Sequence, residues 1–193
     1  MPVTRRSFLV LAVLGALLPS TVPAAESAPD LAEIGRRWRC DRASGRFKEK
    51  KFVGGFSKPV VSEGRFEAER GRSVRWITEK PRASSLTFEP GGIRYEDAES
   101  QSSLPAAGLP ANSDYGAYLA GILLGDFDFF ADDWRIGVTE DRGVVTVTLL
   151  PKPGTMPGAS QIEIRGRSRI ESAVITLPTG EREELILKHV SRS

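Results

Sequence analysis

The chain has 193 residues, and its 27 Lys and Arg against 25 Asp and Glu leave a net charge of +2. Arg5 and Arg6 account for the whole excess, because they are the only charged residues before position 25 and subtracting them leaves 25 charges of each sign. A neutral domain without a basic stripe gives no support to nucleic-acid binding. Cys40 is the single cysteine, so the chain cannot form an internal disulfide and must rely on its hydrophobic core.

The first residues have the pattern of a secretion signal. Arg5 and Arg6 precede an apolar run over residues 8–18 that is too short to span a membrane, and small residues for cleavage follow at 22–24. Residues 4–9, T-R-R-S-F-L, also fit the twin-arginine pattern, so two export routes remain open. We predict a signal peptide over residues 1–24, export to the periplasm, and one domain over residues 25–193.

The first predicted element of the exported chain is a helix over residues 28–40. Asp30 is a suitable N-cap, and apolar residues recur after it at helical spacing. Strands follow from residue 47 to about residue 97, separated by short turns that contain glycine or proline. Residues 98–110 are rich in Ser, Ala, Gly and Pro, and we predict a loop there.

The strands between residues 60 and 81 alternate apolar and charged side chains. One face of the predicted sheet collects Phe66, Ala68, Val74 and Trp76, and the other collects Glu63, Arg65, Glu67 and Glu69. Arg70 breaks this rule, because a continuing strand would place it on the apolar face. A buried guanidinium is costly unless it is paired and hydrogen-bonded. Arg70 therefore either has a partner inside the fold or reaches solvent at the strand end.

The segment over residues 112–130 differs in composition from its surroundings. Asn112 or Ser113 can cap a helix there, and the predicted helix carries Tyr115, Tyr118, Leu119, Ile122 and Leu123. Three phenylalanines follow Gly125 in the stretch D-F-D-F-F-A-D-D. Strands again fill residues 134–190. Because the order helix, strands, helix, strands contains no βαβ alternation, we predict an α+β fold with one antiparallel sheet and the helices gathered on one side. A twisted sheet of about ten strands tends to curl, and helices over its mouth would bury the apolar face of both.

A set of motifs carries a family resemblance. Its members are Phe47, Glu49, Lys50, Gly64, Arg70, Trp76, Thr78 and Pro81, followed by Asp133-Trp134 and Leu150-Pro151-Lys152. In this order the chain resembles, over residues 31–188, the periplasmic outer-membrane lipoprotein carrier LolA and its relatives. Among these are LolA-like proteins of polyene or polyketide pigment gene clusters. The resemblance implies a strongly curved antiparallel sheet, an incomplete β-barrel, with helices forming a lid on the concave side over a hydrophobic cavity.

The same resemblance implies a function. The chain would be a monomeric carrier that binds acyl chains of lipoproteins, receives them from an inner-membrane donor complex and delivers them to an outer-membrane acceptor. Arg70 would hold the lid shut through hydrogen bonds and release it as ligand enters. Gly71 stands where the family usually has proline, which would loosen this strand end. A carrier or scaffold for another lipid, of the polyene or polyketide type, and a β-sheet binding module without cargo remain alternatives.

Two sets of residues would form the ligand-binding site together with Arg70. The cavity wall comprises strand residues of inward parity, namely Phe66, Val74, Trp76, Leu86, Phe88, Val145, Val147, Leu149, Ile162 and Ile164. The lid contributes Tyr118, Leu119, Ile122 and Phe127. All of these residues would serve equally well as a packed core. The lid glycines either weaken the helix, by roughly 0.5–1 kcal/mol each relative to alanine, or permit close packing on the sheet.

Groups suited to catalysis are few. His189 is the single histidine, and no neighbour in the sequence suggests a triad. One histidine and one cysteine do not make a transition-metal site, and the acidic residues of 126–133 lack the glycine-centred spacing of a calcium loop. The sequence has neither a phosphate-binding glycine loop nor a dinucleotide fingerprint. We therefore expect no enzyme activity, no cofactor and no bound metal.

Overall fold

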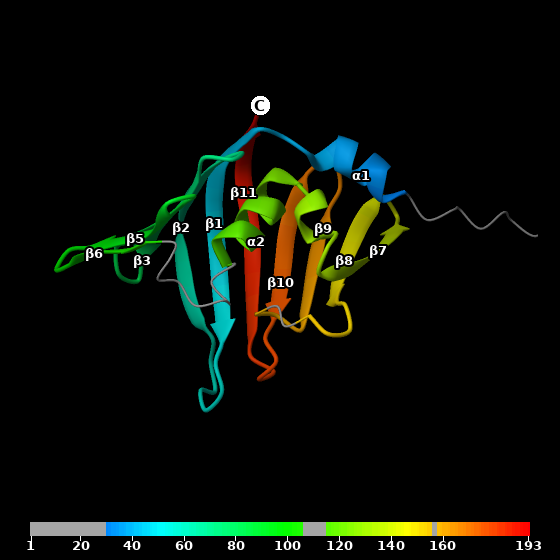
Figure 1. Ribbon diagram of the computed structural model, residues 1–193. Coiled ribbons are helices and arrows are strands. Elements are labelled where there is room, and N and C mark those ends of the chain that lie inside the picture. The colour runs from blue at the N-terminus through cyan, green and yellow to red at the C-terminus, as the bar shows by residue number, and fades with distance from the viewer. Residues whose placement is uncertain (1–29, 106–114, 156–157) are drawn as a thin grey trace, which may run out of the picture.

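The computed structural model describes residues 30–105, 115–155 and 158–193 (Figure 1). The elements in chain order are α1 (Leu31–Trp38), β1 (Arg42–Phe52), β2 (Val60–Glu69), β3 (Ser73–Lys80), β4 (Ser84–Glu89), β5 (Gly92–Asp97), β6 (Gln101–Pro105), α2 (Tyr115–Leu124), the 3-10 helix η2 (Asp128–Phe130), β7 (Trp134–Asp141), β8 (Val144–Pro151), β9 (Gln161–Gly166), β10 (Ile170–Thr176) and β11 (Arg182–Arg192). The predicted signal peptide and the caps predicted at Asn112 or Ser113 lie outside the described residues.

All strands of the described residues belong to one antiparallel sheet, in the order β6-β5-β4-β3-β2-β1-β11-β10-β9-β8-β7. Two meanders, β1 to β6 and β7 to β11, are joined by the pairing of β1 with β11. The edge strands β6 and β7 do not pair with each other in this part of the chain, so the sheet is not closed into a barrel. The predicted α+β fold with an open antiparallel sheet is confirmed.

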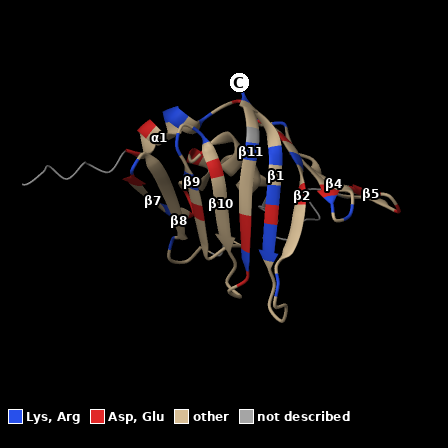
Figure 2. Cartoon of the chain, turned by 180° about the vertical axis from the view of Figure 1, so that it is seen from behind, with Lys and Arg blue, Asp and Glu red and all other residues tan. Residues whose placement is uncertain are grey.

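The sheet is curved, and α2 lies against its concave face (Figure 1), packed on β1, β2, β3 and β10. Register shifts occur between Ser44 and Arg46 in β1 and between Glu63 and Gly64 in β2. Such bulges bend a strand and increase its twist. Lys, Arg, Asp and Glu residues recur along β1, β2 and β11 (Figure 2). In β2 the buried and exposed residues alternate as the sequence predicts.

Local chemistry sets the helix ends. The Asp30 carboxylate accepts a hydrogen bond from the Ala32 backbone N at 3.3 Å, which confirms the predicted cap of α1. The second helix, predicted to carry residues from Tyr115 to Leu123, is α2, and it ends at Leu124, where Gly125 follows with a φ of +63°. This left-handed conformation is typical of the glycine that ends a helix. A Cβ at Gly125 would also lie 2.5 Å from the Trp38 carbonyl oxygen.

The loop predicted over residues 98–110 is wrong for Gln101–Pro105, which forms strand β6. Its serines and proline have low strand propensity, but its backbone pairs with β5, for example Ser103 with Arg94. As an edge strand, β6 tolerates a proline at its end. Tertiary pairing therefore outweighs local composition here.

Candidate ligand-binding site

Three stacked aromatic rings lie on the concave face of the sheet. Phe47 of β1 stacks on Trp76 of β3 with ring centroids 3.8 Å apart, and Phe66 of β2 lies 6.2 Å from the same indole. Two glycines make room for these rings. A Cβ at Gly64 would lie 2.9 Å from the Phe47 ring, and one at Gly45 would lie 3.1 Å from the Phe66 ring. Phe47, Gly64 and Trp76 therefore form one packing unit.

The other predicted wall residues share this face, but they are not equally covered. Those that are buried are Val74, Val145, Val147, Leu149, Ile162 and Ile164. Leu86 and Phe88 of β4 pair with Trp76 and Val74 of β3, so they face the same way, yet both are only half-buried. β4 lies closer to the edge of the sheet than β3 does. The most accessible part of the predicted wall is therefore at β4.

α2 is an uncharged helix that occupies the middle of the concave face. Its sequence is Y-G-A-Y-L-A-G-I-L-L, and Tyr118, Leu119 and Ile122 are buried. A helix that is apolar on all sides is expected to be covered on all sides. Phe127, which follows α2, is also buried, with its ring centroid 6.1 Å from that of Trp38 in α1. The lid residues predicted from the sequence therefore lie inside the protein.

The glycines of α2 permit its close approach to neighbouring side chains. A Cβ at Gly116 would lie 2.3 Å from the Phe88 ring, and one at Gly121 would lie 2.7 Å from the Phe130 ring. Phe130 in turn stacks on Tyr118 with centroids 5.9 Å apart. Of the two interpretations of the lid glycines, these contacts favour close packing.

A cleft of about 340 Å³ borders the first residues of α2, between this helix and strands β3 to β5. Val74, Phe88, Ile93, Ala117 and Ala120 supply its apolar lining, and it also has charged residues, Glu69, Arg72 and Glu89. α2 itself covers the central wall residues. The structure therefore shows the predicted hydrophobic site in a largely filled form, with this cleft beside the helix.

Arg70 connects the end of β2 with the end of α2. Its guanidinium donates hydrogen bonds to Asp126, to Asp41 Oδ1 at 3.0 Å and to the Cys40 carbonyl at 2.9 Å. β2 ends at Glu69, so Arg70 belongs to the following turn and does not continue the strand as the parity argument assumed. The side chain is 31% exposed and its charge is paired. Because Asp126 lies just beyond α2, Arg70 contacts the end of the predicted lid.

A second guanidinium reaches the same aspartate. Arg39 donates to Asp126 at 2.8 Å and also to Asp128. The Cys40 backbone N donates to the Leu124 carbonyl at 3.0 Å, which satisfies one of the free carbonyls at the helix end. α2 is thus tied at its C-terminal end, whereas its N-terminal end borders the cleft. We refer to Arg39, Asp41, Arg70, Asp126 and Asp128 as the anchor cluster.

Two carboxyl groups of neighbouring strands, one of them buried, form a pair that was not predicted from the sequence. Glu49 of β1 is 4% exposed, interacts with Glu183 of β11, and has the Lys51 ammonium 3.4 Å away. Burial and then the hydrogen bond with Glu183 raise the pKa of Glu49 to about 8, while Lys51 opposes the shift. Strand alternation could have predicted the burial of Glu49, because it lies two residues after the inward-facing Phe47 and so shares its face of the sheet.

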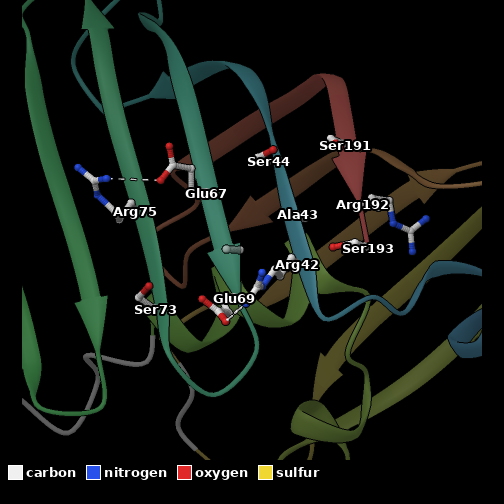
Figure 3. Close-up of a pocket in the computed structure, with 11 residues that line it drawn as sticks. Arg42, Ala43, Ser44, Glu67, Glu69, Ser73, Arg75, Ser191, Arg192 and Ser193 are labelled. Atoms are coloured by element: carbon white, nitrogen blue, oxygen red, sulfur yellow. Dashed lines mark hydrogen bonds and ion pairs between the residues drawn. The ribbon is translucent and has the colours of Figure 1, made fainter.

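A polar hollow of about 410 Å³ lies on the outer face, across the ends of β11, β1, β2 and β3 (Figure 3). Arg42 pairs with Glu69 at 2.8 Å, and Arg75 with Glu67 at 3.4 Å. These charges compensate one another within the hollow. Its lining is mainly charged residues and serines, unlike that of the cleft beside α2.

Within the described residues, no three His, Cys, Asp or Glu side chains gather as metal ligands would. The same part of the chain contains no helix that is both long and apolar enough to cross a membrane. His189 belongs to β11, but its side chain is outside the described part of the structure. Cys40 is half-buried beside the end of α2, with its sulfur 3.9 Å from the Leu124 carbonyl oxygen.

Solved structures similar to this chain include proteins linked by name to lipoproteins. A LolA superfamily protein from Nitrosomonas europaea aligns over 84% of this chain and 92% of its own, with 7% identity and a TM-score of 0.47. A putative outer membrane lipoprotein-sorting protein domain from Vibrio parahaemolyticus aligns over 84% and 91%, with 10% identity and a TM-score of 0.43. Lipoprotein LppX from Mycobacterium tuberculosis aligns over 82% and 93%, with 8% identity and a TM-score of 0.42. No protein-family model and no curated protein sequence matches the chain. The strand order and contacts of the chain itself, rather than these likenesses, define its fold and site.

Proposed function

We propose that this protein is a periplasmic carrier that shields the acyl chains of a lipoprotein or another lipid on the way to the outer membrane. The observation that supports the proposal is α2, an uncharged helix seated on the concave face of an open sheet and tied mainly at one end. Among the described residues, the backbone hydrogen bond that ties α2 to another segment of the protein is the one from the Cys40 N to the Leu124 carbonyl. Moving α2 would therefore uncover an apolar surface without breaking the hydrogen bonds of the sheet.

The energetics of such an exchange favour an acyl chain as ligand. Displacing α2 removes its packing on β1, β2, β3 and β10, and a ligand must replace these contacts. Burial of an alkyl chain contributes about 0.8 kcal/mol per CH₂ group, so a long acyl chain offsets the loss. The cleft beside Gly116 is the proposed entrance, because the wall is already partly accessible there.

The anchor cluster would set how readily the site opens. Hydrogen bonds between charged groups contribute about 1.5–3 kcal/mol each, less where the groups are partly exposed. Arg70 thus stabilises the closed form enough to cover an empty site, and its bonds must be lost or rearranged when α2 moves. The proposed partners are an inner-membrane donor complex and an outer-membrane acceptor, with the protein acting as a monomer.

Extraction of bound lipid tests the carrier proposal directly. Protein purified from the periplasm of a lipid-containing host should release acylated molecules into organic solvent, detected by mass spectrometry. It should also bind a fluorescent fatty-acid probe that the extracted lipid displaces. Visible absorption of the extract would instead identify a polyene cargo. Absence of both extracted lipid and probe binding would overturn the proposal and favour a binding module without cargo, which the filled concave face also suits.

Substitution of the anchoring arginine tests the opening mechanism. Arg70→Leu should leave the sheet intact and tighten binding of the fatty-acid probe between about threefold and tenfold, because less free energy is needed to populate the open form. The measurement is a probe titration, with circular dichroism to verify the fold. Arg65→Leu is the matched control, since Arg65 lies on the outer face of β2, the strand that precedes Arg70, and pairs with Glu79. Equal affinities for the two variants would rule out a role of Arg70 in opening.

A further inference from the structure

The hairpin between β1 and β2 projects beyond the sheet, at the end away from the chain's C-terminus (Figure 1). β1 pairs with β11 as far as Phe52, opposite Arg182, and with β2 as far as Lys51, opposite Val60. The turn is closed by Gly55, with a φ of +85°, and by the Phe56 backbone N, which donates to the Val53 carbonyl at 3.2 Å. The turn over residues 53–59 thus lies past the last paired residues of β1 and β2.

This tip concentrates the exposed apolar side chains of the described residues. The described residues include six exposed large hydrophobic residues, and four of them, Val53, Phe56, Val60 and Val61, lie within nine consecutive positions. Phe56 is 71% exposed and Val60 is 48% exposed. Exposed apolar side chains that occur singly need no explanation, but a cluster at a projecting tip marks an interaction surface. We refer to residues 50–61 as the hairpin tip.

The charges of the hairpin tip have one sign. Lys50, Lys51 and Lys58 are its only charged residues. Lys50 and Lys51 have neighbouring glutamates of β11 at 3.9 and 3.8 Å, and none of the described carboxylates pairs with Lys58. On the adjacent turn, Glu181 accepts a hydrogen bond from the Gly54 backbone N at 3.3 Å. Phe56 therefore stands beside a lysine whose charge is available to an anionic partner.

The small size of the hairpin tip favours a membrane surface over a protein as its partner. A stable protein interface buries about 800 Å² on each side, which a narrow hairpin with four exposed apolar residues does not offer. A membrane surface needs less, because projecting apolar groups enter the boundary between headgroups and acyl chains while lysines remain among the phosphates. From this combination we infer that the hairpin tip docks the protein on an anionic phospholipid surface, with Phe56 inserted. The inference does not depend on the carrier function, because it uses no residue of the concave face.

Tryptophan fluorescence tests the insertion of Phe56. The native tryptophans Trp38, Trp76 and Trp134 are buried, so Phe56→Trp adds an exposed reporter to the protein purified from the periplasm. With vesicles of phosphatidylcholine and phosphatidylglycerol, its added emission should shift to shorter wavelength and be quenched by brominated acyl chains. Quenching of the wild-type protein measures lipid uptake into the interior separately. Unchanged emission of Phe56→Trp in the presence of these vesicles would overturn the inference.

Vesicle flotation measures the contribution of each side chain. Phe56→Ser should weaken binding to the anionic vesicles about tenfold. Leu150→Ser is the matched control, because Leu150 is a 39% exposed apolar residue of β8 outside the tip. Lys58→Gln should weaken binding about fivefold on the anionic vesicles and leave binding to pure phosphatidylcholine unchanged. Equal flotation of Phe56→Ser and Leu150→Ser would overturn the inference, as would a Phe56-dependent dimer in solution.

Discussion

At the scale of single residues, Glu49 is the most unusual side chain of the sheet. It is buried on the same face as Phe47, and it interacts with Glu183 of β11 and with Lys51. Its pKa is raised to about 8, so folding near neutral pH requires this carboxyl to take up a proton that the unfolded chain lacks. Each unit of pH between the unfolded and folded pKa values then lowers stability by up to about 1.4 kcal/mol.

This linkage gives a pH-dependent prediction. The stability contribution is complete below the ordinary glutamate pKa of 4.5 and is lost as the pH rises toward about 8. The free energy of unfolding of the wild-type protein should therefore fall across that range. Glu49→Gln, which carries no ionisable proton, should show a flatter dependence and be the more stable protein at the alkaline end.

Urea unfolding at a series of pH values measures this difference. Glu67→Gln serves as the control, because Glu67 lies on the outer face of β2 and pairs with Arg75. It should follow the wild-type curve. A Glu49→Gln protein whose unfolding free energy has the same pH slope as the wild type would show that Glu49 is ionised in the fold.

At the scale of elements, α2 depends on close contact with β4. Gly116 touches the Phe88 ring so closely that a Cβ would lie 2.3 Å from it. Gly116→Ala should separate the first turn of α2 from β4 and lower the free energy of unfolding by about 1–3 kcal/mol, the usual effect of overpacking. Hydrogen exchange should become faster in the N-terminal turn of α2 and stay unchanged in β1 and β11.

The same substitution in the other helix is a matched control. A Cβ at Gly35 in α1 has no atom within 4 Å. Gly35→Ala should raise the free energy of unfolding by roughly 0.5–1 kcal/mol through helix propensity alone. If both variants are stabilised to the same degree, α2 does not pack on Phe88 as closely as described.

At the scale of the whole molecule, the sequence predicts what depends on local pattern. Period-two alternation correctly assigns the faces of β2 and β3, and Asp30 marks the start of α1. Features set by distant partners are not predictable in this way. Asp126 lies 56 positions from Arg70, and Glu49 meets Glu183 only through the register of β1 on β11. Strand β6 likewise forms because β5 is beside it.

In the candidate site, too, local pattern predicted some features and contacts between distant residues determine the others. Parity identified which side chains face inward, but it could not decide between a hollow and a packed interior. That outcome depends on where α2 sits and on the room that Gly116 and Gly121 leave for it. The direction of Arg70 was inferred from a strand that in fact ends one residue earlier. Its contact with the end of α2 results from the turn geometry.

The pairing of β1 with β11 has a consequence for how the protein is assembled. The two meanders share one hydrogen-bonded seam, and it is made by the first and last strands of the described chain. Because β11 is synthesised after every other strand of the sheet, the pairing that joins the two halves cannot be complete before β11 has been made. A chain cut before Arg182 would keep ten of the eleven strands and still lack the seam that makes them one surface.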